Sequence, residues 1–531
     1  MHTIPSASLV PSVPEQAVRD IAAMYQAAVD EHRMVGVTWA IVGGHGHEQA
    51  VLAHGAAGHQ EVAAGSPVAG SAPMGRGSIS RIASLTKSFT AATILALRDE
   101  GALRLDDPVE QHLPEARGAI DLPADARPLT LRDLLTMSSG LVTDNPWGDR
   151  QESMSREQFA ALLRGGLALS HTPGTRYEYS NTGYAMLGRV IDEVTGGDYA
   201  AEIRARFLEP LGMVDSAFEA TSLDAARVAT GHRTNERTDA TRFEAVPLDR
   251  PGVYGAMAGI YSTVDDLAAW MRFLAAADAP DAAQRPQDLL GTASRREMQQ
   301  IHRHDLLPPL PAGPDGRSPG FDRVRGYGYG LVVDVWPDLR ELVSHSGGYP
   351  GYGAFMQWHR DSGVGVVALA NSKYAPLQPL SVQAFRLLAE HEPQLLAPRR
   401  PDPSPRALQA AQVALDWLRG SGDQRAGDQL ADAWFADNMD PDISREERRR
   451  RLQQALQIAG LGVEALDGLT VDSAQVLSST HLSWTVPGAD QAGSGERAGA
   501  DGPRDLRIDL QLDPRREALI QGLDTVALPR R

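Results

Sequence analysis

Apolar and β-favouring positions change their spacing along the chain, from strand-like to helix-like and back. After a helical pattern at 16–33, residues 34–42 and 50–53 are strand-like and flank a glycine-rich turn, and helical periods then prevail from 84 to 276. Strand-like segments return later, at 328–335, 340–345, 352–359 and 364–371, before a helix at 379–391. This order predicts an α+β fold (an α/β sandwich), with an antiparallel sheet formed from both ends of the domain, flanked by helices, and a mostly helical insertion.

A proline-rich break at 396–406 separates this region from the rest of the chain. Its prolines favour neither helix nor strand, so it is predicted to be a linker. Beyond it the patterns are helical and then strand-like, at 407–419, 426–436, 444–459, 469–487, 506–512 and 518–527, with a loop expected at 488–503. With 531 residues the chain also exceeds the roughly 250–300 residues of one core. We expect an N-terminal arm at 1–15, a main domain at 16–395, the linker, and a smaller C-terminal α+β domain at 407–531.

Composition and charge exclude several classes of function. A net charge of -17 argues against a nucleic-acid surface or a polybasic membrane patch. The absence of cysteine excludes disulfides, thiol nucleophiles and cysteine–zinc sites. His45 and His47 lie in a glycine-rich turn without a third ligand at a suitable spacing, so we predict no metal and no cofactor. No signal-like N-terminal segment and no run of ~18 apolar residues is visible, which predicts a cytoplasmic protein without membrane association.

The stretch Arg81–Phe89 carries the candidate chemistry. An apolar helical pattern follows it as far as Gly101, which places Ser84 in the first turn of a helix and Lys87 three residues later on the same face. A hydroxyl beside an amine is a nucleophile beside a candidate base. Such a spacing often arises by chance, but of 51 basic residues only Lys87 and Lys373 are lysine. Because arginine keeps its proton and a buried lysine can lose it, we expect Lys87 to take part in proton transfer.

Two further motifs follow in the chain, Tyr179-Ser180-Asn181 and His345-Ser346-Gly347. Together with Ser84-Leu85-Thr86-Lys87 they resemble the serine β-lactamase and penicillin-binding-protein superfamily. The most similar branch joins class C β-lactamases, DD-carboxypeptidases, D-aminopeptidases and β-lactamase-like esterases. Flanking sequence is also similar, at 105–109, 131–135, 210–213, 328–330 and 347–351, so the resemblance extends over roughly residues 15 to 395.

The resemblance implies a serine hydrolase that forms an acyl-enzyme on Ser84. Lys87 or Tyr179 would be the base, since a cationic neighbour lowers the pKa of a tyrosine. Asn181 would hold a substrate carbonyl and position Lys87. A strand ending in His345-Ser346-Gly347-Gly348 would bind the substrate along its backbone, and the N–H groups of Ser84 and Gly348 would form the oxyanion hole.

His345 stands where class C β-lactamases carry lysine, so the fixed cation that suits a β-lactam carboxylate is missing. This favours a small ester, an amide or a peptide of D-amino acids as substrate. The alternatives are a β-lactamase proper, or a non-catalytic protein that binds penicillin or peptide in the same pocket. Trp147 would lie on a rim loop, with Tyr349 and Tyr352 on the opposite wall, although ordinary loop packing explains these aromatics equally well. The C-terminal domain has no chemical motif and is a candidate module for homo-oligomer formation or for covering the pocket.

Overall fold

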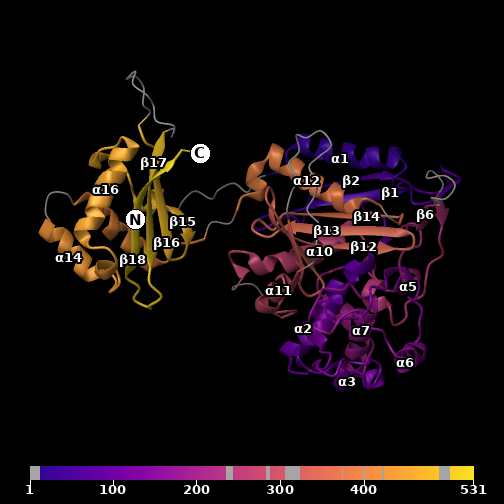
Figure 1. Ribbon diagram of the computed structural model, residues 1–531. Helices are drawn as coiled ribbons and strands as arrows, with labels where there is room; N and C mark the ends of the chain where they lie inside the picture. The colour runs from indigo at the N-terminus through magenta and orange to yellow at the C-terminus, as the bar shows by residue number, and fades with distance from the viewer. Residues whose placement is uncertain are drawn as a thin grey trace. The chain divides into compact units, whose positions relative to one another are not determined.

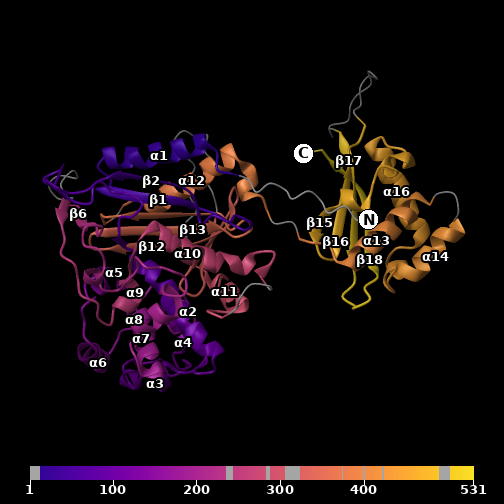
Figure 2. The same cartoon turned by 180° about the vertical axis from the view of Figure 1, so that it is seen from behind.

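The computed structural model describes residues 12–234, 243–282, 288–304, 323–373, 375–398, 401–420, 424–489 and 503–530. The chain forms two compact units, Met1–Pro398 and Arg399–Arg531, each with its own sheet and core (Figures 1 and 2). Most of the predicted arm and of the loop at 488–503 lies outside the described residues. Within those residues, no helix has the length and apolar character that crossing a membrane requires.

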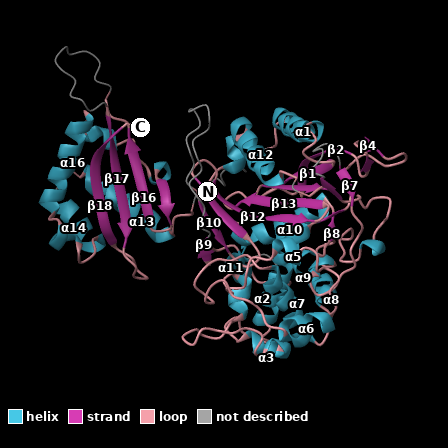
Figure 3. Cartoon of the chain, turned by 45° about the vertical axis from the view of Figure 1, so that its right-hand side comes forward, coloured by secondary structure: helices cyan, strands magenta, loops and turns pink. Residues whose placement is uncertain are grey.

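An eight-stranded antiparallel sheet lies at the centre of the first unit, in the order β2-β1-β14-β13-β12-β11-β10-β9 (Figure 3). β1 (Gly36–Val42) pairs with β14 (Gly365–Ala370), with Val37 opposite Ala370. Both ends of the unit therefore build one sheet, which confirms the predicted fold class. The remaining strands are β2 (Val51–Gly58), β9 (Arg303–His304), β10 (Val324–Tyr327), β11 (Val332–Trp336), β12 (Arg340–Tyr349) and β13 (Tyr352–His359).

Helices cover both faces of this sheet (Figure 1). On one face, α1 (Glu15–Asp30) and α12 (Leu377–His391) share a core with alternate residues of β1, such as Trp39 and Ile41. The residues between them, such as Ala40, belong to the larger core on the other face, which includes α10 (Val264–Ala275). Because β1 is buried on both faces, its sequence is apolar at nearly every position.

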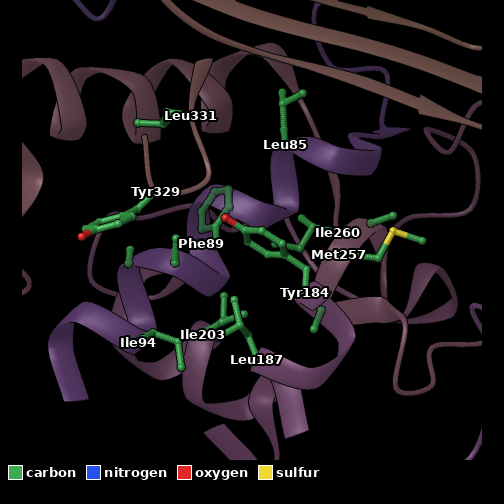
Figure 4. Packing of buried hydrophobic residues seen from close by; sticks show 14 of the residues in the cluster. Leu85, Phe89, Ile94, Tyr184, Leu187, Ile203, Met257, Ile260, Tyr329 and Leu331 are labelled. Atoms are coloured by element: carbon green, nitrogen blue, oxygen red, sulfur yellow. The ribbon is translucent and has the colours of Figure 1, made fainter. Parts of the chain in front are cut away.

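The helical insertion surrounds α2 (Thr86–Asp99), which is buried at every position from Thr86 to Leu97. Phe89 and Ile94 of this helix pack among side chains from α7 (Asn181–Thr195) and α9 (Gly255–Ala258) (Figure 4). The other helices of the insertion are α3 (Val109–His112), α4 (Leu131–Leu135), α5 (Asn145–Gly148), α6 (Arg156–Arg164), α8 (Tyr199–Ile203) and α11 (Thr292–Met298). The first unit also contains three short strand pairs, namely β3 (Val62–Ala63) with β4 (Ser66–Pro67), β5 (Ser80–Arg81) with β8 (Tyr261–Ser262), and β6 (His232–Thr234) with β7 (Phe243–Ala245).

Two helices begin at the predicted caps. The Thr130 hydroxyl accepts the Asp133 N–H, and the Asp133 carboxylate accepts the Thr130 N–H, so α4 starts with a capping box. Thr263 caps α10 through the N–H of Asp266. Both caps satisfy backbone donors that the first helical turn leaves unpaired.

Two strand predictions for the main sheet are wrong in detail. The segment 328–335 is a turn followed by β11, because Gly330 adopts φ 67° and a Cβ there would lie 2.6 Å from the Lys87 carbonyl oxygen. β12 does not end at 345 but continues to Tyr349, with His345 opposite Met356 on β13. The motif that begins at His345 therefore lies inside a paired strand.

The second unit packs helices against a four-stranded antiparallel sheet, in the order β15-β16-β17-β18. Alternate residues of β17, such as Leu506 and Ile508, are buried in its core. The strands are β15 (Gln475–Ser478), β16 (His481–Val486), β17 (Arg504–Leu512) and β18 (Ile520–Pro529); the helices are α13 (Pro405–Arg419), α14 (Gln424–Trp434), α15 (Met439–Asp442) and α16 (Arg445–Ala459). This is the smaller α+β unit that the sequence predicts, with 469–487 forming two strands rather than one run.

Candidate active site

Ser84 lies on a 3₁₀ turn, η1 (Ala83–Leu85), that leads directly into α2. The turn is anchored by the Ile82 N–H, which donates to the Ile260 carbonyl at 2.9 Å. Ala83 adopts φ 49°, a left-handed conformation that costs a non-glycine residue about 1 kcal/mol. Ser84 is 7% exposed, so the turn presents its hydroxyl at the edge of the buried core.

β12 approaches this turn closely because position 347 is glycine. A Cβ on Gly347 would lie 2.3 Å from the Ile82 carbonyl oxygen, a distance that no side chain tolerates. A Cβ on Gly348 would meet no atom within 4 Å, so the strand faces open space at that residue. The backbone at Gly347 and Gly348 therefore lies beside Ser84 and borders the cleft.

Lys87 is fully buried beneath Ser84. Its Nζ lies 3.1 Å from Ser84 Oγ, 2.8 Å from Asn181 Oδ1 and 3.1 Å from the Met257 carbonyl oxygen. Burial lowers the pKa of Lys87 to about 7, although nearby carboxylates act in the opposite direction, namely Asp149, Asp144 and Glu152. A substantial fraction of the amine is therefore neutral near pH 7 and able to accept a proton.

Tyr179 lines the same cleft as Ser84 and lies close to Lys87. The Lys87 ammonium is 5.0 Å from the centre of its ring, and the Ser84 hydroxyl acts to lower the pKa of its phenol. Burial nevertheless raises the pKa of Tyr179 well above its ordinary value of 10. The predicted downward direction is wrong, because desolvation of the phenolate outweighs the lowering effect of the Ser84 hydroxyl.

Asn181 is the first residue of α7, which Ser180 caps by accepting the Gly183 N–H. Its side chain joins Lys87 to the loop around α5, since Asn181 Nδ2 donates to Asn145 Oδ1 at 2.9 Å. Asp144 holds the same loop against the helix by accepting the Asn181 N–H at 2.7 Å and the Thr182 N–H at 2.9 Å. The helix start and the loop therefore fix the amide that contacts Lys87.

His345 is buried and neutral. Its Nδ1 donates to the Ser346 carbonyl at 2.7 Å, and its Nε2 accepts from the Tyr327 hydroxyl at 3.0 Å. Burial, reinforced by the charge of Lys87, lowers the pKa of His345 to about 3. Position 345 therefore contributes no positive charge at neutral pH, in agreement with the interpretation of the motif.

These side chains border a cleft of about 860 Å³. Six of the predicted site residues line it, namely Ser84, Tyr179, His345, Ser346, Gly347 and Gly348, while Lys87 and Asn181 lie beneath Ser84. Of the two alternatives for Tyr349 and Tyr352, ordinary packing is the one observed: both are 1% exposed, and their hydroxyls donate to Asp249 and to the Ala229 carbonyl. Trp147 is 44% exposed and packs its ring on Tyr254, beside the cleft-lining residues Asn145 and Pro146.

The structure places in or beside the site four further residues that the sequence did not predict. They are Asp144, Asp149, Tyr327 and Lys373. For Lys373 a signal was present in the sequence, since it is the other lysine of the chain. For the acids and the tyrosine no signal existed, because their roles depend on contacts between segments far apart in the sequence.

The chain belongs to the Beta-lactamase family, whose family model matches residues 21–390. Among curated relatives, protein flp of Staphylococcus aureus is 28% identical over 301 residues, which cover 56% of this chain. The chain spans about half, 53%, of the length of that relative.

Solved structures with a similar fold extend over more of the chain. The octameric penicillin-binding protein homologue from Pyrococcus abyssi superposes with a TM-score of 0.56 at 20% identity, over 96% of this chain and 99% of that one. The D-amino acid amidase from Ochrobactrum anthropi gives a TM-score of 0.52 at 23% identity, over 71% and 99%. At 20–23% sequence identity, these structural similarities show a shared fold and nothing more.

Proposed function

We propose that the protein is a serine hydrolase that cleaves a small ester or amide through an acyl-enzyme on Ser84. The observation that carries this proposal is the buried Lys87 amine, 3.1 Å from Ser84 Oγ, whose pKa burial lowers to about 7. A serine hydroxyl with its ordinary pKa is a weak nucleophile and needs an adjacent base. A lysine that is partly neutral at neutral pH meets this need.

In the acylation step, Ser84 Oγ bonds to the substrate carbonyl carbon and its proton passes to Lys87 Nζ. The N–H groups of Ser84 and Gly348 stabilise the oxyanion that forms. Tyr179, which its raised pKa keeps protonated, donates a proton to the leaving alcohol or amine as the bond to the carbonyl carbon breaks. Lys87 then returns its proton to Tyr179, so that both groups regain their starting protonation. Water next gives a proton to Lys87 as its oxygen bonds to the acyl carbon. The bond from that carbon to Ser84 Oγ breaks, Oγ takes the proton back from Lys87, and the acid product leaves. Tyr179 is thus assigned the part of a proton donor rather than that of the primary base.

The neutral His345 favours substrates without a carboxylate at this position of the pocket. A class C β-lactamase places a lysine there, whereas burial lowers the pKa of His345 to about 3. The amidase from Ochrobactrum anthropi, which has a similar fold, is named for D-amino acid amides. We therefore place esters and D-amino-acid amides before β-lactams as the substrate class.

Incubation with a fluorophosphonate, followed by peptide mass spectrometry, tests this proposal. We expect a single adduct on Ser84, and turnover of at least one member of a panel of nitrophenyl esters, D-amino-acid amides, D-Ala-D-Ala peptides and nitrocefin. An adduct without turnover of any substrate would instead favour a non-catalytic binding protein. An adduct on another residue would overturn the assignment of the nucleophile.

A further inference from the structure

Lys373, the second of the two lysines, lies in the same cleft as Ser84. It follows β14, and its Nζ is 3.5 Å from Asp149 Oδ2. Both side chains are largely buried, with exposures of 16% for Lys373 and 10% for Asp149. Of the 51 lysine and arginine residues of this chain only these two are lysine, and the Asp149 carboxylate interacts electrostatically with both.

Asp149 belongs to the loop that holds the Lys87 environment in place. It directly follows α5, whose Asn145 bonds to Asn181, the amide in contact with Lys87. The loop packs tightly against α7 at position 148, where a Cβ would lie 3.0 Å from the Asn181 Cβ. The position of the Asp149 carboxylate is therefore set by the same contacts that fix the Asn181 amide.

We propose that Asp149 and Lys373 are positioning residues that set the charge state of Lys87. The Asp149 carboxylate favours the protonated form of Lys87, and Lys373, whose Nζ is 3.5 Å from that carboxylate, counteracts its effect. The inference rests on the proposed function only in taking Lys87 as the base. The two lysines thus have different parts, one as the base and one as the counter-charge that helps to keep the base neutral.

The other charged and titratable groups around Lys87 are already committed to partners. Asp144 accepts two backbone N–H groups of α7, and Glu152 lies 3.2 Å from the buried guanidinium of Arg81. His345 is neutral, and the remaining titratable neighbours are the phenols of Tyr179 and Tyr184, whose rings face Nζ. Burial raises the pKa of Asp149, while Lys373 and Lys87 both lower it, so this carboxylate interacts with both lysines.

The lysine composition provides a direct assay. Biosynthetic incorporation of [13Cε]lysine gives two side-chain signals, because the chain has two lysines. The chemical shift of each follows its protonation, so a pH titration reads the pKa of Lys87 without any substrate. Lys373→Arg keeps the charge and removes the second signal, so it assigns the spectrum and serves as the matched control.

We expect Asp149→Asn to lower the titration midpoint of Lys87 and Lys373→Met to raise it, each by about 0.5 or more. The double variant should return towards the wild-type midpoint, and Lys373→Arg should stay close to it. Circular dichroism confirms that each variant is folded, and the arginine variant remains informative if Lys373→Met is not. Unchanged midpoints, or shifts of the same sign in the two single variants, would overturn the proposal.

The same titration separates this inference from the proposed function. Shifted midpoints in a protein that hydrolyses nothing would leave the charge coupling intact and refute the hydrolase. Hydrolysis with unchanged midpoints would refute only the coupling. In an active enzyme, the acid limb of kcat/KM should move with the midpoint, which a purely structural defect would not produce.

Discussion

Lys87 in the first unit and Arg448 in the second are both buried cations, and the two are bound in different ways. In the first unit, Lys87 contacts one carbonyl, one amide oxygen and the Ser84 hydroxyl. In the second, Arg448 donates to three backbone carbonyls, at 3.3 Å to Leu523, 2.9 Å to Met439 and 3.2 Å to Ile443. Burial lowers the pKa of both, but a guanidinium stays protonated at any accessible pH. A buried arginine thus fastens segments together with a fixed charge, whereas a buried lysine can exchange a proton.

The two units also differ in how many polar side chains they bury around these cations. Around Lys87 the first unit buries acids, an amide and a histidine, including Asp144, Glu152, Asn181 and His345. The described core of the second unit buries few polar side chains, namely Arg448, Ser483 and Asp513. Burying a polar group costs free energy unless the group is paired. The concentration of buried polar groups around Lys87 therefore indicates a functional site rather than a structural core.

The largest effect should come from removing the nucleophile. Ser84→Ala can form no acyl-enzyme, so we expect fluorophosphonate labelling to vanish and kcat to fall by about 10⁴ or more. Mass spectrometry and steady-state kinetics measure both. Because Ala fits the 7%-exposed site, the thermal midpoint should not fall. Persistent labelling would show that another residue is the nucleophile.

Replacing the buried lysine by arginine tests whether Lys87 acts through an exchangeable proton or only through its charge. Lys87→Arg keeps the charge but removes the exchangeable proton, so we expect turnover to fall by ~10²–10⁴ with little change in the thermal midpoint. Raising the pH should not restore the rate, because arginine does not titrate there. Wild-type turnover in a folded Lys87→Arg protein would contradict the part assigned to Lys87.

The reciprocal change, Arg448→Lys, should affect stability and leave catalysis intact. An ammonium cannot reach the three carbonyls that the planar guanidinium binds, so we expect a loss of about 1–3 kcal/mol in the free energy of unfolding of the second unit. Chemical denaturation measures this loss, while the rate of fluorophosphonate labelling serves as the control. A lower labelling rate without a change in stability would contradict the contrast drawn between the two units.

The smallest expected effect on activity comes from cutting the chain at the predicted boundary between its two domains. Limited proteolysis should cut first within the predicted linker at 396–406 or within 488–503, before it cuts the buried insertion around α2. The fragment that contains Ser84 should keep its labelling rate. Early cleavage between 84 and 200 with the linker intact would refute the predicted domain boundaries. Light scattering before and after cleavage tests whether the C-terminal domain is a module for homo-oligomer formation, and a higher labelling rate after cleavage would instead favour a module that covers the pocket.

Periodicity and motif order predicted most of the fold, and the eight site residues predicted from the motifs lie together in the structure. The apolar run of β1 and the helical patterns of the insertion are local signals, and so are the caps Thr130 and Thr263. The turn at 328–331 was not predicted, because it results from the approach of Gly330 to the backbone of Lys87, which no local pattern encodes.

The electrostatics of the site could not be predicted in the same way. The direction of the Tyr179 pKa depends on how deeply its phenol is buried, and a sequence does not state burial depth. The contact between Lys373 and Asp149 joins positions separated by 224 residues. Only the scarcity of lysine indicated that position 373 differs from the other cations of the chain.

The pH dependence of Ser84 acylation tests the central claim most directly. Burial lowers the pKa of Lys87 to about 7, so the neutral amine gains population as the pH rises to that value. We expect the second-order rate of fluorophosphonate labelling to rise about tenfold per pH unit below pH 7 and to level off above it. A rate that is flat across this range, or that begins to rise only near the ordinary lysine pKa of about 10.4, would show that neutral Lys87 is not the base.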